Sequence, residues 1–146
     1  MPKLSLSQAD IIADETLKKG REIKAKPLTV VVLDDGGHYK VVKRDDGCGL
    51  LRADIARAKA WGVLGMGQAG RELARRAQSL PVFFSGLAAI SGGKLVPLPG
   101  GVLIHTPDGE LVGSVGVSGD LSEIDEECAV HGVKAAGLVP ETGDEA

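Results

Sequence analysis

The segment from residue 100 to residue 119 constrains the fold most, because it has the pattern of a β-hairpin. Two apolar runs, residues 102–104 and 111–117, flank the sequence Thr-Pro-Asp-Gly at residues 106–109. Proline pre-sets φ, aspartate can bond its own backbone and glycine accepts a positive φ, so these four residues favour a tight turn. Small residues then lead into an acidic helix start near residue 121. The segment predicts two antiparallel strands followed by a helix.

A second hairpin is predicted nearer the start of the chain. Residues 28–33 form a β-branched run, residues 34–37 read Asp-Asp-Gly-Gly, and residues 38–43 form a return strand. Three consecutive valines at positions 30–32 predict a central strand that is buried on both faces.

The remaining segments have helical spacing. Apolar residues recur every three or four positions between residues 6 and 23, with Ser5 or Ser7 as the N-cap. Further helices are predicted over residues 50–66, with a break at 65–68, and over residues 68–79 and 121–136. We expect only a short helical turn at 82–90, an irregular loop at 91–101 and a frayed acidic tail from Pro140. This order predicts an α+β fold, an antiparallel sheet flanked by helices, in one domain over residues 1–146.

Composition excludes several classes of function. The net charge of −3 argues against a general binder of nucleic acid or of anionic membranes. No apolar run approaches the roughly 20 residues that a membrane span needs, and no secretory leader opens the chain. Cys48 and Cys128 are isolated from each other and from any cluster of metal ligands. We therefore expect a cytoplasmic protein with two reduced thiols, without a membrane or nucleic-acid partner and without a metal site built from clustered ligands.

Five segments together carry a family resemblance, namely residues 30–38, 44–47, 56–60, 109–119 and 125–129. They resemble the GlcG/HbpS-type family, often called the haem-degrading domain, which is also similar to the C-terminal domain of PduO-type proteins. The resemblance implies a profilin-like antiparallel sheet flanked by helices, homo-oligomeric assembly, and binding of haem or a corrinoid-related ligand. Between Trp61 and Ser79 the sequence departs from the family pattern, since a glycine-rich run at 62–67 replaces alanine and threonine. This departing segment is a candidate lining of the ligand pocket.

Charged residues suggest how a ligand would be held. Arg44 and Lys59 are cations that could neutralise the carboxylates of a haem propionate or of an organic acid, and Asp46 lies beside Arg44. The alternative is a structural ion pair between Lys59 or Arg44 and Asp34 or Asp46, because buried charges need partners. The resemblance favours the ligand pocket, since these positions match recurrent ones in the family.

The glycine-rich loop adds further candidates. Gly92, Gly93 and Gly101 lie in or beside the irregular stretch at 91–101, where backbone could approach a ligand closely. Gly92 and Gly93, followed by Lys94, could offer backbone N–H groups to an anion, although no strand-to-helix context precedes them.

Two histidines are candidate haem ligands. His38 follows one predicted turn and His105 precedes another, so both are expected near sheet ends. A single imidazole can ligate haem iron, and the alternative is a solvated turn histidine. His131 has Glu127 and Cys128 within one helical turn, which we interpret as incidental. Ser118 lacks the context of a nucleophile and is interpreted as a turn or cap residue.

Three functions follow from these observations. The first is a small-molecule binding protein of the GlcG/HbpS type, with haem as the possible cofactor and haem degradation as a further step. The second is a cofactor-independent isomerase, hydrolase or lyase acting on a small organic acid, with Asp46 or Asp34 as base and Arg44 as carboxylate anchor. The third is a non-catalytic accessory oligomer. The residues assign no catalytic group.

Overall fold

The computed structural model describes residues 3–143 and contains five helices and five strands in that range. The helices are α1 (Leu6–Glu22), α2 (Arg52–Met66), α3 (Gly70–Ser79), α4 (Pro81–Ile90) and α5 (Ser122–Ala135). The strands are β1 (Thr29–Asp34), β2 (Tyr39–Arg44), β3 (Gly101–His105), β4 (Leu111–Ser118) and β5 (Val139–Glu141). All four strand pairings are antiparallel, and the sheet order is β2-β1-β4-β3-β5. The predicted α+β class and both hairpins are confirmed.

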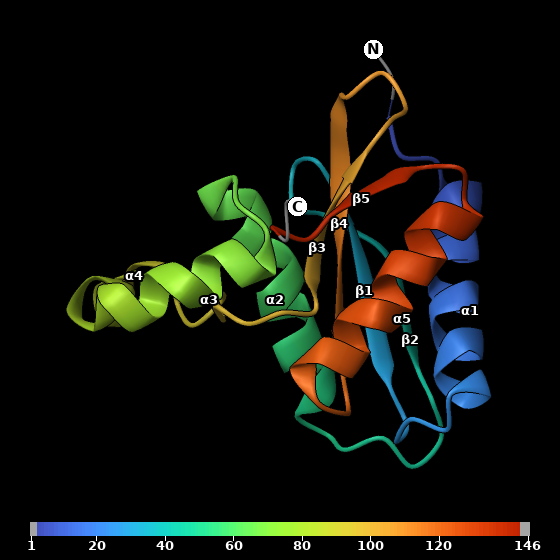
Figure 1. The fold of residues 1–146 in the computed structure, drawn as a ribbon, viewed down its shortest axis with the longest axis horizontal. Helices are drawn as coiled ribbons and strands as arrows, with labels where there is room; N and C mark the ends of the chain where they lie inside the picture. Colours follow the sequence, from blue (N-terminus) through green and yellow to red (C-terminus); the bar gives the residue numbers. More distant parts are fainter. Residues whose placement is uncertain (1–2, 144–146) are drawn as a thin grey trace.

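Helices cover both faces of this sheet (Figure 1). Helices α1 and α5 lie side by side on one face, where Ile12 and Ala129 pack with Val30 and Val32 of β1. Helix α2 lies on the other face, where Ala56 packs against the alternate residues of the same strand. Strand β1 is therefore buried on both faces, as its valine run predicts.

The two layers lie very close where α2 crosses β4. A Cβ on Gly116 would collide with the carbonyl oxygen of Ala56 and the backbone nitrogen of Ala60. Glycine at this position lets the helix backbone approach the strand, which brings the charged side chains of α2 within reach of the strand end.

Helix boundaries follow local chemistry. Ser5 is the N-cap of α1, because its hydroxyl accepts a hydrogen bond from the Gln8 backbone N–H while the Gln8 side chain accepts one from the Ser5 N–H. The predicted break after α2 is confirmed, since Gly67 ends that helix at φ 67°.

Two predictions about local structure were wrong. The segment at 82–90 is a full helix rather than a short turn, because Pro81 pre-organises its first turn and Gly92 and Gly93 end it. The tail is ordered beyond Pro140: β5 pairs with β3, and the carbonyl oxygens of Thr142 and Gly143 accept hydrogen bonds from Arg71 and Arg75. Residues 144–146 lie outside the described residues.

Helices α3 and α4 project away from the sheet as an arm (Figure 1). Leu73 and Phe84 hold the arm to the core, packing with Leu95 and Leu103. Within residues 3–143, no helix is both long and apolar enough to cross a membrane.

Candidate ligand-binding surface

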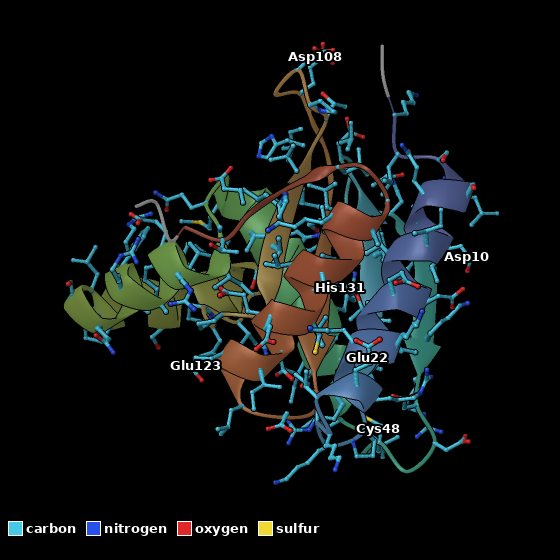
Figure 2. The ribbon with its side chains drawn as sticks, turned by 45° about the vertical axis from the view of Figure 1, so that its right-hand side comes forward. Asp10, Glu22, Cys48, Asp108, Glu123 and His131 are labelled. Atoms are coloured by element: carbon cyan, nitrogen blue, oxygen red, sulfur yellow. The ribbon has the colours of Figure 1, made fainter. Side chains whose placement is uncertain are left out.

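The predicted site residues lie at opposite ends of the sheet. Arg44 pairs with Thr29 at the start of β1, whereas His38 follows the turn at the end of that strand. His105 pairs with Leu111 at the same end as His38. In Figure 2, Cys48 marks the Arg44 end of the sheet and Asp108 marks the opposite end. A strand of six residues separates the two ends, a distance of about 17 Å at ~3.3 Å per residue.

At the first end, Arg44 is engaged by the backbone. Its Nη1 atom donates a hydrogen bond to the carbonyl oxygen of Cys48 at 3.1 Å. Asp46 lines a polar groove of about 350 Å³ together with Gly20, Arg21 and Pro27. The hypothesis of an organic-acid enzyme has Asp34 or Asp46 as the base and Arg44 as the carboxylate anchor. Asp34 lies at the far end of β1 from Arg44, so these two residues cannot form one site.

Lys59 is buried, with a side chain that is 3% exposed, and does not face solvent. Its ammonium donates hydrogen bonds to the carbonyl oxygen of Val117 at 2.9 Å and to Oδ2 of Asp125 at 3.2 Å. The other carboxylate oxygen of Asp125 accepts from the Asp120 backbone N–H at 2.9 Å. Burial lowers the pKa of Lys59 and raises the pKa of Asp125, while their mutual attraction opposes both shifts. Lys59 therefore has a structural partner, although that partner is neither Asp34 nor Asp46.

The predicted glycines also have structural roles. Gly101 packs directly on the carbonyl group of Lys59, so no ligand fits between them. The backbone N–H groups of Gly92 and Gly93 donate to the carbonyl oxygens of Ala89 and Ala88 at the end of α4. They are therefore not free to bind an anion, in agreement with the missing strand-to-helix context.

Gly92 and Gly93, both candidate site residues from the sequence, nevertheless line a hollow. This hollow of about 220 Å³ lies between α2 and the loop after α4, and its charged walls are Asp54, Arg57 and Lys94. The Nε atom of Arg57 is buried and has no hydrogen-bond partner within residues 3–143, and its guanidinium lies 5.4 Å from the Tyr39 ring centre.

Two further hollows share the walls Trp61 and Gly65. The apolar hollow, of about 190 Å³, is lined by Trp61, Gly65, Met66, Leu87, Ile90, Ser91 and Leu95. The turn hollow, of about 170 Å³, is lined by Asp35, Gly36, Gly37, Trp61, Leu64 and Gly65. The ammonium of Lys94 lies 5.5 Å from the centre of the Trp61 ring, which connects both to the charged hollow. We call these three hollows together the Trp61 surface.

The histidines stand at the same end of the sheet as the turn hollow. The His38 ring lies 3.2 Å from Oδ1 of Asp34, and a Cβ on Gly36 would lie 2.9 Å from that ring. Hydrogen bonds to its carboxylate lower the pKa of Asp34 although its burial acts in the opposite direction. His105 bonds Glu141 of β5 at 2.7 Å. Of the two predicted histidines, His38 is the one whose ring lies next to a residue that lines the turn hollow, namely Gly36.

The third histidine and the thiols lie elsewhere. His131 of α5, labelled in Figure 2, lies 3.2 Å from the Glu15 carboxylate of α1. No group of three metal-ligating side chains forms among the residues that the structure describes. Cys48 and Cys128 are both free and buried, and the Thr29 hydroxyl bonds the Cys48 sulfur at 3.2 Å.

The sequence carried a partial signal for this surface. Trp61 opens the segment where the chain departs from the GlcG/HbpS pattern, and Gly65 and Met66 lie within that segment. Arg57 was not predicted as a site residue, and Lys94 was named only as the residue that follows Gly92 and Gly93. Their proximity depends on how α2 meets a loop more than thirty residues away. The surface combines an aromatic ring, aliphatic walls and two cations, with the carboxylates Asp54 and Asp35 also in its walls. The ring, the aliphatic walls and the cations suit a flat apolar ligand with anionic substituents.

Comparisons with known proteins identify the fold and the family. The chain is similar to a protein solved as a PduOC:heme complex, with 26% identity, a TM-score of 0.84, and coverage of 94% of this chain and 97% of that one. HbpS is 27% identical with a TM-score of 0.79, over 92% of this chain and 90% of HbpS. Protein ORFY of Klebsiella pneumoniae is 25% identical with a TM-score of 0.82, over 93% of this chain and 92% of ORFY. No curated protein sequence matches the chain. The family model described as haem degrading protein HbpS-like matches residues 4–134, so the chain belongs to the HbpS-like family.

Proposed function

We propose that this chain binds haem on the Trp61 surface. The observation that carries the proposal is the apolar hollow beside Trp61, with the Lys94 ammonium 5.5 Å from the ring centre. The similarity to the protein of the PduOC:heme complex over 94% of this chain supports haem as the ligand.

The residues present fit the chemistry of haem. A porphyrin needs a flat apolar contact, which Trp61, Leu87 and Leu95 supply. Its propionates need cations, and Arg57 and Lys94 line the neighbouring charged hollow. The unpaired buried Nε of Arg57 has hydrogen-bonding capacity that no described residue uses.

Two side chains are candidates to ligate the iron. Met66 lines the apolar hollow, and a methionine thioether is a known haem ligand type. The His38 ring lies beside Gly36, which lines the turn hollow, so we propose His38 as the second candidate. When bound, haem supplies iron that can bind and activate O₂. The chain's own residues would orient the macrocycle and pair its carboxylates, and we propose binding as the function.

Lys59, Arg44, Asp46 and Gly101 do not belong to this proposed contact set. Lys59 and Gly101 hold α2 against the strands, and Arg44 bonds the backbone. We propose that the protein acts in the cytoplasm as a homo-oligomer, which is consistent with its two free buried thiols and net charge of −3.

A hemin titration followed at the Soret band tests the proposal. Wild type is expected to give a saturable shift, and Lys94→Gln should weaken affinity roughly tenfold by removing a charge-assisted contact. Met66→Leu conserves volume and His38→Ala removes the imidazole, so the one that alters the bound Soret spectrum identifies the ligand. His105→Ala is the matched control, because His105 bonds Glu141. A broad, non-saturating change that none of these variants affects would mean adventitious adsorption and would overturn the proposal.

A further inference from the structure

The charged hollow between α2 and the loop after α4 has two cations in its walls, Arg57 and Lys94. Within residues 3–143, neither of them forms an ion pair with a carboxylate. Each lies against an aromatic ring instead. The guanidinium of Arg57 lies 5.4 Å from the centre of the Tyr39 ring, and the ammonium of Lys94 lies 5.5 Å from the centre of the Trp61 ring. The hollow therefore has two positive charges that no described side chain pairs with.

The side chain of Arg57 is already held in place without a ligand. Its Nε atom is buried, and its guanidinium contacts Tyr39 of β2, so two elements of the fold fix its position. Because the buried Nε has no hydrogen-bond partner among the described residues, this part of the cation has lost water without gaining an acceptor. An anion in the hollow would supply the missing opposite charge, and it would not need to order a mobile side chain.

Asp54 determines how much negative charge the hollow can accept. It precedes Arg57 by three positions on α2 and lines the same hollow. Two cations against one carboxylate leave the hollow with an excess of one positive charge, which a singly charged anion neutralises. A dianion would place a further, uncompensated negative charge beside Asp54. The hollow is therefore matched to a monoanion.

The size of the hollow limits the ligand to a small molecule. Its volume of about 220 Å³ corresponds to about seven water molecules at ~30 Å³ each, so a short carboxylic acid fits and a porphyrin does not. Ala58 adds an aliphatic wall for a short hydrocarbon chain. A Cβ on Gly92 or Gly93 would meet nothing within 4 Å, so the loop side of the hollow is open for entry.

We propose that the charged hollow binds a small monocarboxylate independently of haem. Arg57 from α2 and Lys94 from the loop donate to the two carboxylate oxygens, and Asp54 disfavours dianions. The same two cations are the proposed partners of the haem propionates, so a bound acid competes with haem for them. This competition, unlike the carboxylate site itself, rests on the proposed function.

Titration of the haem-free protein with sodium butyrate, at constant ionic strength, tests the site through the NMR signals of the Gly92 and Gly93 amides. Wild type is expected to give a saturable shift with a Kd on the order of 1 mM. Arg57→Gln should weaken binding roughly tenfold, because it removes a charge-assisted contact. Lys134→Gln is the matched control, since it removes one exposed cation from α5 on the opposite face of the sheet. No saturable shift in wild type, or equal weakening in both variants, would overturn the proposal.

Two further probes and one further variant test the charge match. Butyramide, which has the same shape without the charge, and sodium sulfate, a dianion, should each bind wild type roughly tenfold more weakly than butyrate does. Asp54→Asn should bind butyrate more tightly and sulfate about as well as butyrate, because the repelling carboxylate is gone. Circular dichroism and thermal melting establish that each variant folds. Sulfate binding as tight as butyrate binding in wild type, or unchanged affinity for both anions in Asp54→Asn, would overturn the assigned role of Asp54.

Hemin titration of wild type with and without saturating butyrate separates this proposal from the previous one. Weaker hemin binding in butyrate supports the shared use of the two cations. Saturable butyrate binding without hemin binding would overturn the proposed function and leave the carboxylate site supported. Hemin binding without a butyrate shift at Gly92 and Gly93 would overturn the carboxylate site and leave haem binding supported. Binding of both ligands without competition would overturn the shared use of the cations.

Discussion

The ammonium of Lys59 lies 3.2 Å from Oδ2 of Asp125, and this buried ion pair joins helices from opposite faces of the sheet. We expect Lys59→Met to lower the free energy of unfolding by about 3–5 kcal/mol, because the Asp125 carboxylate would remain buried without its partner. Urea denaturation measures the change. The exposed pair Arg21–Asp45 provides the control, and Arg21→Ala should cost at most about 1 kcal/mol.

The double variant Lys59→Met/Asp125→Leu sharpens this test. Removing both charges abolishes the desolvation cost, so the double variant should be more stable than Lys59→Met alone. A Lys59→Met protein within about 1 kcal/mol of wild type would contradict a structural role for the pair.

Gly116 is predicted to be the least replaceable glycine of β4. A Cβ there would collide with the Ala56 carbonyl, so Gly116→Ala should lower the free energy of unfolding by about 3 kcal/mol or more. Gly49→Ala is the control, because its nearest non-neighbouring atom would lie 3.8 Å away, and its effect should stay within about 0.5 kcal/mol. Equal melting temperatures for the two variants would contradict the close approach of α2 to β4.

The two thiols should be inert in the folded protein. Burial, and secondarily the charge of Glu127, raises the pKa of Cys128 to about 12 from its ordinary value of 9.0. Labelling by a thiol reagent at pH 8 should be slow in the native protein and should reach two thiols per chain in denaturant. Cys48→Ser and Cys128→Ser assign each signal, and rapid native labelling of Cys128 would contradict its burial.

The same shift predicts alkaline instability. Because the folded pKa of Cys128 lies above the unfolded value, its contribution to stability is complete below pH 9 and is lost as the pH rises toward 12. Cys128→Ser should therefore show a smaller loss of stability than wild type between pH 9 and pH 11, measured by thermal melting.

Asp120 should contribute to acid sensitivity. Its carboxylate accepts hydrogen bonds from the backbone N–H groups of Lys26 at 2.8 Å and Leu121 at 2.7 Å, which lower its pKa below the ordinary 3.8. Because the pKa of Asp120 is lower in the folded state than in the unfolded state, its carboxylate stabilises the protein at pH values above the unfolded-state pKa. This contribution is lost as the pH falls through the folded-state pKa. The stability difference between wild type and Asp120→Asn should thus shrink below about pH 4. Asp108→Asn controls for the loss of one exposed carboxylate, and a difference that grows in acid would contradict this role.

Local patterns predicted the elements that depend on near neighbours. The valine run predicted the burial of β1 correctly, and α2 ends at Gly67, the last residue of the glycine-rich run at 62–67. Helix α4 was underestimated because its composition is apolar without periodicity, and such a pattern does not separate a helix from a loop. The tail was underestimated because its order depends on Arg71 and Arg75, about seventy residues earlier.

The candidate site depended on longer-range geometry. The partner of Lys59 is 66 positions away, so charge pattern alone suggested Asp34 or Asp46 instead of Asp125. Trp61 and Lys94 meet because α2 and the loop after α4 converge, which no spacing in the sequence encodes. The family resemblance supplied the ligand class, and the fold supplied the surface that would bind it.

The central claim is that haem binds beside Trp61, and the indole N–H of this single tryptophan gives it a unique NMR signal. Paramagnetic ferric hemin should broaden the Trp61 indole signal and the amides of Gly37 and Gly92 beyond detection, whereas diamagnetic zinc protoporphyrin should only shift them. The amide of Asp46, at the other end of the sheet, should remain sharp with both. An unbroadened Trp61 signal at saturating hemin, or broadening centred on Asp46, would contradict the account.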